Sequence, residues 1–113
     1  MSINKLLLTP NEQIALKEAK KLLKSKFPVQ ELMVFGSVAR GKATEESDLD
    51  LLVITRRPVS HVEKHAMSDL VFEINLSNGT NISILVVDRD TWKTGLWSVL
   101  PLYQEVVRDG ISL

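Results

Sequence analysis

The sequence predicts an α+β fold, a two-layer arrangement in which helices pack against a small β-sheet. Three observations lead to this prediction: two long segments with helical apolar spacing, three short segments rich in β-branched and apolar residues, and breaks marked by Gly, Pro or Asn. The chain has 113 residues, 44% of them hydrophobic, which suits one domain with a small core. We therefore expect residues 1–113 to form a single domain.

The first predicted helix runs from Thr9 to about Lys26. Thr9, Pro10 and Glu12 match a capping box with proline at the first helical position. Four apolar residues are expected to face inward: Ile14, Ala15, Leu22 and Leu23. The lysines of this helix are interpreted as a solvated face rather than as a binding surface.

Strands are predicted at residues 31–35, 48–54 and 80–87. A helix at residues 59–77 separates the last two and ends at Gly79, which suits a left-handed cap. Its expected inward stripe consists of Val62, Ala66, Leu70, Val71 and Ile74.

The remainder of the chain predicts two short helices. Asp88 caps the first of them, so the acidic residues there indicate a helix start rather than a metal site. The last helix begins at Val99 or Pro101 and runs to Asp109 before Gly110.

Two aspartates at the start of the second strand are the first candidate site residues. Asp48 and Asp50 alternate with Leu49 and Leu51, so both carboxylates point to one face, roughly 6.6 Å apart along the backbone. Carboxylates this close repel each other, and a divalent cation removes that repulsion. Mg²⁺ prefers such paired oxygen ligands, completed by water and substrate phosphates.

A glycine-serine turn precedes this strand. The apolar run at residues 31–35 ends at Gly36 and Ser37, and a short helix-compatible stretch follows. Glycine lets the backbone approach a ligand closely, and the first N–H groups of the following turn attract anions. The Ser37 hydroxyl adds a donor, and Arg40 can reach an anion from the same side of the turn. The turn is therefore a candidate phosphate-binding site.

Together these segments, GSVARG and SDLDLLV, resemble the signature of the DNA polymerase beta-like nucleotidyltransferases in their minimal, stand-alone form. The resemblance extends over nearly the whole chain. It implies a nucleotidyltransferase fold with a small mixed sheet flanked by helices, Mg²⁺ held by Asp48 and Asp50, and a nucleoside triphosphate, most simply ATP, held by Gly36 and Ser37. In that chemistry two metals about 4 Å apart activate the attacking hydroxyl and stabilise the leaving pyrophosphate.

One position departs from the family pattern. Family enzymes carry a third carboxylate on a later strand, and the matching stretch NISILVVD has Ser83 there. Serine has no charge, so the second metal loses an anionic ligand and the acceptor loses the residue that usually helps to deprotonate it. Glu73, on the preceding helix, is the best substitute ligand that the sequence offers.

Composition limits the partners. Lys and Arg together number 14, equal to Asp and Glu, and this zero net charge disfavours a protein that holds long nucleic acid. No apolar run approaches the ~20 residues needed to cross a membrane. The chain has no cysteine, which agrees with a cytoplasmic location.

Three functions fit these features. The first is transfer of a nucleoside monophosphate, AMP from ATP, to a hydroxyl of a partner protein, with Asp48 and Asp50 as the catalytic pair. The second is a weak or inactive nucleotide-binding subunit that acts like an antitoxin by covering its partner. Stand-alone members of the family often accompany a HEPN-type protein. The third, a tailoring enzyme for RNA or small molecules, usually needs a further substrate domain. The sequence does not determine the base of the nucleotide, the acceptor molecule or whether the chain forms a homo-oligomer.

Overall fold

The computed structural model describes residues 8–36, 48–93 and 100–113. Four strands form one mixed sheet in the order β3-β2-β1-β4. β1 (Val29–Phe35) is antiparallel to β2 (Leu49–Thr55) and to β4 (Ile111–Ser112), whereas β2 is parallel to β3 (Ile82–Asp88). The predicted α+β fold with a mixed sheet and flanking helices is therefore confirmed.

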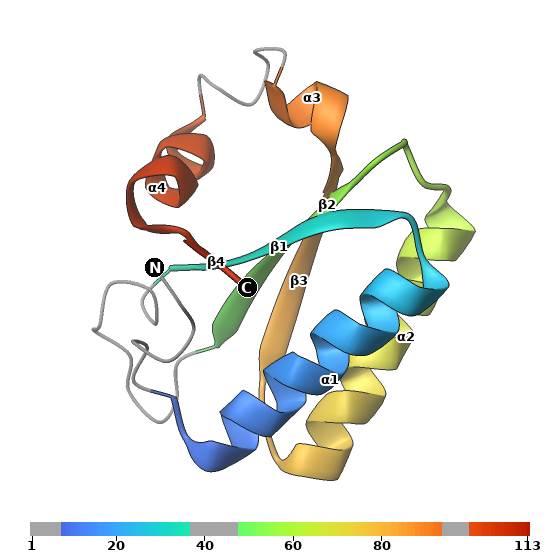
Figure 1. The fold of residues 1–113 in the computed structure, drawn as a ribbon, viewed down its shortest axis with the longest axis vertical. Helices are drawn as coiled ribbons and strands as arrows, with labels where there is room; N and C mark the ends of the chain where they lie inside the picture. Colours follow the sequence, from blue (N-terminus) through green and yellow to red (C-terminus); the bar gives the residue numbers. More distant parts are fainter. Residues whose placement is uncertain (1–7, 37–47, 94–99) are drawn as a thin grey trace.

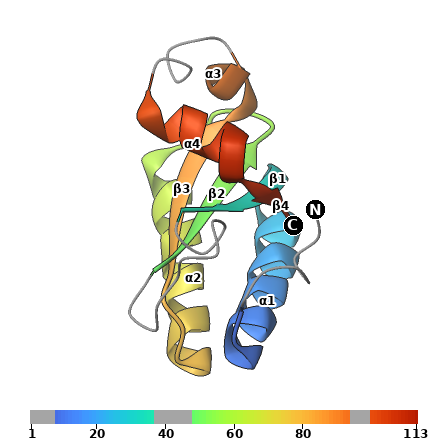
Figure 2. The same ribbon diagram turned by 90° about the vertical axis from the view of Figure 1, so that its left-hand side faces the viewer.

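Two long helices cover one face of the sheet. α1 (Pro10–Lys26) and α2 (His61–Asn78) lie side by side, and Figure 1 shows the sheet between them and α4 (Pro101–Asp109). α3 (Arg89–Lys93) follows β3 directly, and Figure 2 shows α4 crossing the part of the sheet that lies away from α1. The helices thus lie on both faces and leave the start of β2 and β3 outside α4.

Alternation along the strands divides the core into two clusters. In β2, Leu49, Leu51 and Val53 pack with α1 and α2, whereas Leu52 and Ile54 pack with Val106 of α4 and with Trp92 of α3. Because successive side chains of a strand point to opposite faces, Asp50 belongs to the face of Leu52, which α1 and α2 do not cover.

Local signals explain why the long helices begin and end where they do. Thr9 and Glu12 form the predicted capping box of α1, and Ser60 and Glu63 form a second one at the start of α2. Gly79 ends α2 with φ of 65°, as its left-handed cap predicts.

The inward faces of the helices differ in part from the prediction. Ile14 is 54% exposed and Val62 is 80% exposed, so both predictions of burial are wrong, as is that for Ala66. The buried positions of α1 are Ala15, Leu16, Ala19 and Leu23, and those of α2 are Met67, Val71 and Ile74. α1 and α2 contact each other as well as the sheet. The buried positions of each helix therefore face both the other helix and the sheet.

Within the described ranges, no helix is both long and apolar enough to cross a membrane.

Candidate active site

Asp48 and Asp50 lie at the beginning of β2. Asp48 directly precedes the strand and is exposed, and Asp50 is half-buried one alternation further in. Leu49 and Leu51 between and beyond them are buried on the other face. The structure therefore gives the alternation that the sequence predicts, with the two carboxylates sharing one face of the sheet.

Gly36 comes directly against the Asp50 carboxylate. Its φ is +80°, a conformation that L-residues with side chains rarely adopt, and it follows Phe35, the register partner of Asp50. A Cβ atom on Gly36 would overlap Asp50 Oδ2 and stand 3.3 Å from Asp50 Cγ. Glycine is thus required for two reasons: the positive φ, and the lack of space for a Cβ atom beside Asp50. Ser37 and Arg40, the other predicted phosphate-binding residues, lie outside the described residues.

Ser83 lies beside Asp50 on the neighbouring strand. The two residues are register partners in the parallel pair of β2 and β3, so their side chains stand on the same face of adjacent strands, about 4.8 Å apart at the backbone. Ser83 is exposed. The position where the resemblance implies a third carboxylate is therefore next to the pair, and it carries a hydroxyl.

Two asparagines that the sequence did not single out hold this end of the sheet. Asn81 Nδ2 donates a hydrogen bond to Asp48 Oδ1, and Asn81 O accepts one from Leu49 N at 2.9 Å. Asn75 of α2 donates to Ile82 O at 3.0 Å and accepts from Ile82 N at 2.9 Å. Asn75 therefore fixes the start of β3 in the way that a neighbouring strand would.

These asparagines escape sequence reasoning because their role depends on register. Asn81 and Ser83 repeat the i, i+2 spacing of Asp48 and Asp50, but only the parallel pairing of β2 with β3 brings the two sets together.

Glu73, the suggested substitute ligand, is exposed on α2. α2 packs on the Leu49 and Leu51 face of the sheet, opposite to the Asp50 side chain. The structure does not bring Glu73 to the aspartate pair. Across residues 8–36, 48–93 and 100–113, no group of three or more His, Cys, Asp or Glu side chains gathers to hold a metal.

A hollow of about 350 Å³ opens beside Asp48, between α2 and β3. Asp48 and Ser83 contribute to its lining from the start of β2 and from β3, and Ser68, Phe72 and Asn75 contribute from α2. The hollow therefore links the candidate site to the outward surface of α2.

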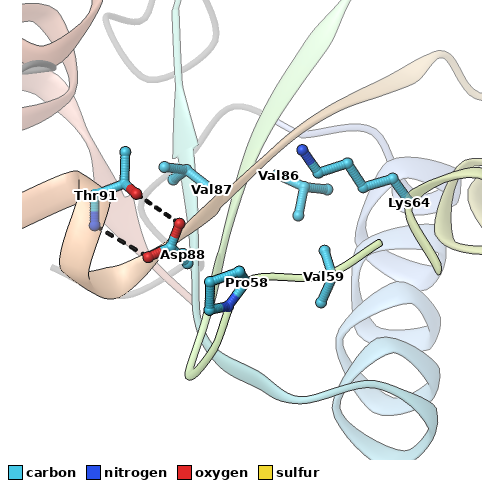
Figure 3. Close-up of a pocket in the computed structure, with 7 residues that line it drawn as sticks. All are labelled: Pro58, Val59, Lys64, Val86, Val87, Asp88 and Thr91. Atoms are coloured by element: carbon cyan, nitrogen blue, oxygen red, sulfur yellow. Dashed lines mark hydrogen bonds between the residues drawn. The ribbon is translucent and has the colours of Figure 1, made fainter. Parts of the chain in front are cut away.

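A smaller pocket, of about 150 Å³, lies at the opposite end of β3 (Figure 3). Asp88 lines it, but both of its carboxylate oxygens are engaged by Thr91: Oδ2 accepts from the backbone N–H at 3.1 Å and Oδ1 from the hydroxyl at 2.6 Å. The hydroxyl bond and then the backbone bond lower the pKa of Asp88. The prediction that Asp88 starts a helix is confirmed.

Comparison with known proteins identifies the family. Residues 16–99 match the model of the nucleotidyltransferase domain family. The chain belongs to this family. It is 33% identical over 103 residues to a candidate protein adenylyltransferase of Methanocaldococcus jannaschii, across 88% of this chain and 95% of that protein. The predicted membership is thereby confirmed.

Solved structures of nucleotidyltransferase domains share the fold. A candidate minimal nucleotidyltransferase is 28% identical with a TM-score of 0.54, covering 95% of this chain and 99% of its own. A chain in the structure of a tri-AMPylated Shewanella oneidensis HEPN toxin with its MNT antitoxin has a TM-score of 0.55 at 19% identity, covering 88% of this chain and 69% of its own. At that identity the second likeness concerns the fold alone.

Proposed function

We propose that this nucleotidyltransferase domain, residues 1–113, transfers AMP from ATP to a hydroxyl of a partner protein of the HEPN type. The observation that carries the proposal is the close approach of Gly36 to the Asp50 carboxylate, because it joins the phosphate-binding turn to the metal-binding strand. The similarity to a candidate protein adenylyltransferase supports the adenylyl group. The fold shared with a chain of the complex between an MNT antitoxin and a tri-AMPylated HEPN toxin supports the class of acceptor.

The donor set at the start of β2 fits one Mg²⁺ ion. Asp48 and Asp50 supply two carboxylates on one face, and the Ser83 hydroxyl lies on the next strand. Mg²⁺ is commonly bound by one or two carboxylates with waters and substrate phosphates. When bound there, the ion would neutralise charge on the phosphates and orient them. Among the described residues a second ion would have only the same two carboxylates, so we propose that it depends on the substrate or partner for its remaining ligands.

In the proposed reaction the acceptor oxygen attacks the α-phosphorus of ATP. A new O–P bond forms, the bond from the α-phosphorus to the oxygen bridging the β-phosphate breaks, and pyrophosphate leaves with that oxygen. The hydroxyl proton passes to Asp50 or to solvent. Gly36 lets the Asp50 carboxylate lie directly against the turn that would bind the triphosphate, with Ser37 and Arg40 as further ligands of the phosphates, and Asn81 holds the Asp48 carboxylate in place.

A second candidate function is a nucleotide-binding subunit that silences its partner by covering it. Ser83 favours this function, because the position beside Asp50 lacks the charge that would help deprotonate the acceptor. We therefore expect turnover to be slow or to depend on the partner.

The test is incubation with labelled ATP, Mg²⁺ and a HEPN-type protein from the same organism. Wild type should label the partner, and an Asp48→Ala, Asp50→Ala double variant should not. Ser83→Asp should raise the rate by about tenfold, since it restores a carboxylate beside Asp50, whereas Ser77→Asp on exposed α2 should not. If wild type labels no more than the double variant, the enzymatic function is wrong. Calorimetry with Mg-ATP then tests the second candidate.

A further inference from the structure

The second half of α2 carries two large apolar side chains on its outer surface. Phe72 is 60% exposed and Leu76 is 69% exposed. They are four residues apart on a helix and therefore neighbours on its surface. Phe72 also lines the hollow that Asp48 and Ser83 line.

The charged residues in the second half of α2 have one sign. From residue 66 to residue 79 the only charged residues are Asp69 and Glu73, both acidic and exposed. Asp48, which lines the same hollow as Phe72, adds a third carboxylate. Along α2, the first basic group before this stretch is His65, one turn before Asp69, with its Nε2 3.6 Å from Asp69 Oδ2. We refer to Asp69, Phe72, Glu73 and Leu76 as the α2 surface.

We propose that the α2 surface is where the acceptor protein docks, through an apolar side chain flanked by lysine or arginine. This inference rests on the proposed function. A protein hydroxyl must come to Asp48 and Asp50, and the hollow that both Asp48 and Phe72 line connects this position with the α2 surface. Aromatic anchors beside complementary charge are typical of interface cores.

The negative charge of the α2 surface favours a basic partner protein over two other ligands, a second copy of the chain and a triphosphate. A second copy of the chain packed on the same surface would set Asp69 and Glu73 against their own equivalents, because a two-fold interface pairs a surface with itself. A triphosphate would be repelled by the same carboxylates. A basic and apolar protein surface is attracted by both features.

The first experiment removes the apolar contact. Phe72→Ser and Leu76→Ser should each raise the KM for the HEPN-type partner by about fivefold or more, with kcat and the calorimetric affinity for Mg-ATP unchanged. Val62→Ser is the matched control, since Val62 is on the same helix and 80% exposed but does not line the hollow. All three side chains are exposed, so circular dichroism melting should show folded proteins.

The second experiment reverses a charge. Glu73→Lys should slow association with the partner severalfold, and the loss should shrink as salt is raised. Glu18→Lys, at an exposed position of α1, should leave association unchanged.

Four results would overturn the inference. The first is equal KM values for Phe72→Ser and Val62→Ser, and the second is a Phe72→Ser variant that loses Mg-ATP affinity alone, which would indicate stacking of the base. The third is a wild-type dimer that Phe72→Ser dissolves. The fourth is equal affinity for the partner, by calorimetry, in the wild type and in the Phe72→Ser and Leu76→Ser variants.

If the wild type transfers no AMP, the proposed enzymatic function alone is wrong, and the calorimetric affinity for the partner still tests the α2 surface.

Discussion

The two ends of β3 carry similar chemical groups in opposite states. At its start Ser83 is exposed beside Asp50, and Asp48 lines an open hollow. At its end Asp88 accepts hydrogen bonds from the backbone and the side chain of Thr91. A carboxylate that accepts hydrogen bonds from the first turn of a helix stabilises the fold. A carboxylate that lines a hollow can bind a ligand.

The partners of the two carboxylates explain the difference further. Asp48 accepts a hydrogen bond from the side-chain amide of Asn81, and its carboxylate also lines the open hollow. Asp88 accepts from a backbone N–H that belongs to the first turn of α3 and cannot leave without unfolding that turn. The start of β3 is therefore the end suited to exchange of ligands.

The largest expected effect is on AMP transfer, which should depend on Asp50 beside the start of β3 but not on Asp88 at its end. Asp50→Asn should lower AMP transfer by about a hundredfold or more, because the amide removes the charge that faces the metal and phosphates. Asp88→Asn keeps the helix start and should retain transfer within about twofold. The measurement is labelled AMP on the partner protein at saturating Mg-ATP. Similar losses in both variants would contradict the division of roles.

The second largest effect should be a loss of stability when Asn75, which holds the start of β3, is replaced. Asn75→Ala leaves the N–H and C=O of Ile82 without the side-chain partners at 2.9 and 3.0 Å and should cost about 2 kcal/mol. Asn78→Ala, three residues on, removes one bond to Ile74 O and should cost less than about 1 kcal/mol. Urea denaturation at neutral pH compares them. Equal costs would mean that the start of β3 is held by other contacts.

Much of this fold could be predicted because its signals are local. The capping box at Thr9 and Glu12, the left-handed Gly79 and the alternation through Asp48 and Asp50 each depend on residues close in sequence. The same holds for Asp88, whose role as a cap needs only Thr91.

Other features depend on packing that a local pattern cannot contain. β4 is two residues long and exists because Ile111 pairs with Val34 across the sheet. Val62 fits a helical apolar stripe, yet α2 faces α1 and the sheet with other positions. The pairing of Asn81 with Asp48 follows from the register of β2 against β3, which no spacing within either strand reveals.

The third prediction distinguishes backbone strain from crowding at the open end. Gly36 and Gly79 both have positive φ, but a Cβ on Gly79 meets nothing within 4 Å. Gly36→Ala and Gly79→Ala should each lose about 1 kcal/mol of stability from the backbone angle. Only Gly36→Ala should also weaken Mg-ATP binding, severalfold by calorimetry, because its Cβ displaces the Asp50 carboxylate. Unchanged binding in Gly36→Ala would show that Asp50 can move aside.

The smallest effect concerns the closed end and its response to acid. Hydrogen bonds from Thr91 lower the pKa of Asp88 below its ordinary value of 3.8 in the folded chain. The stabilisation is therefore complete above the unfolded pKa and is lost as pH falls through the folded one. Asp88→Asn should keep the stability at pH 7 within about 0.5 kcal/mol but flatten its fall below about pH 4, measured by urea denaturation at several pH values. Arg57 and Ser60 also lower the pKa of Glu63, so some slope should persist in the variant. An unchanged slope in Asp88→Asn would mean that the Asp88 carboxylate does not couple folding to acid.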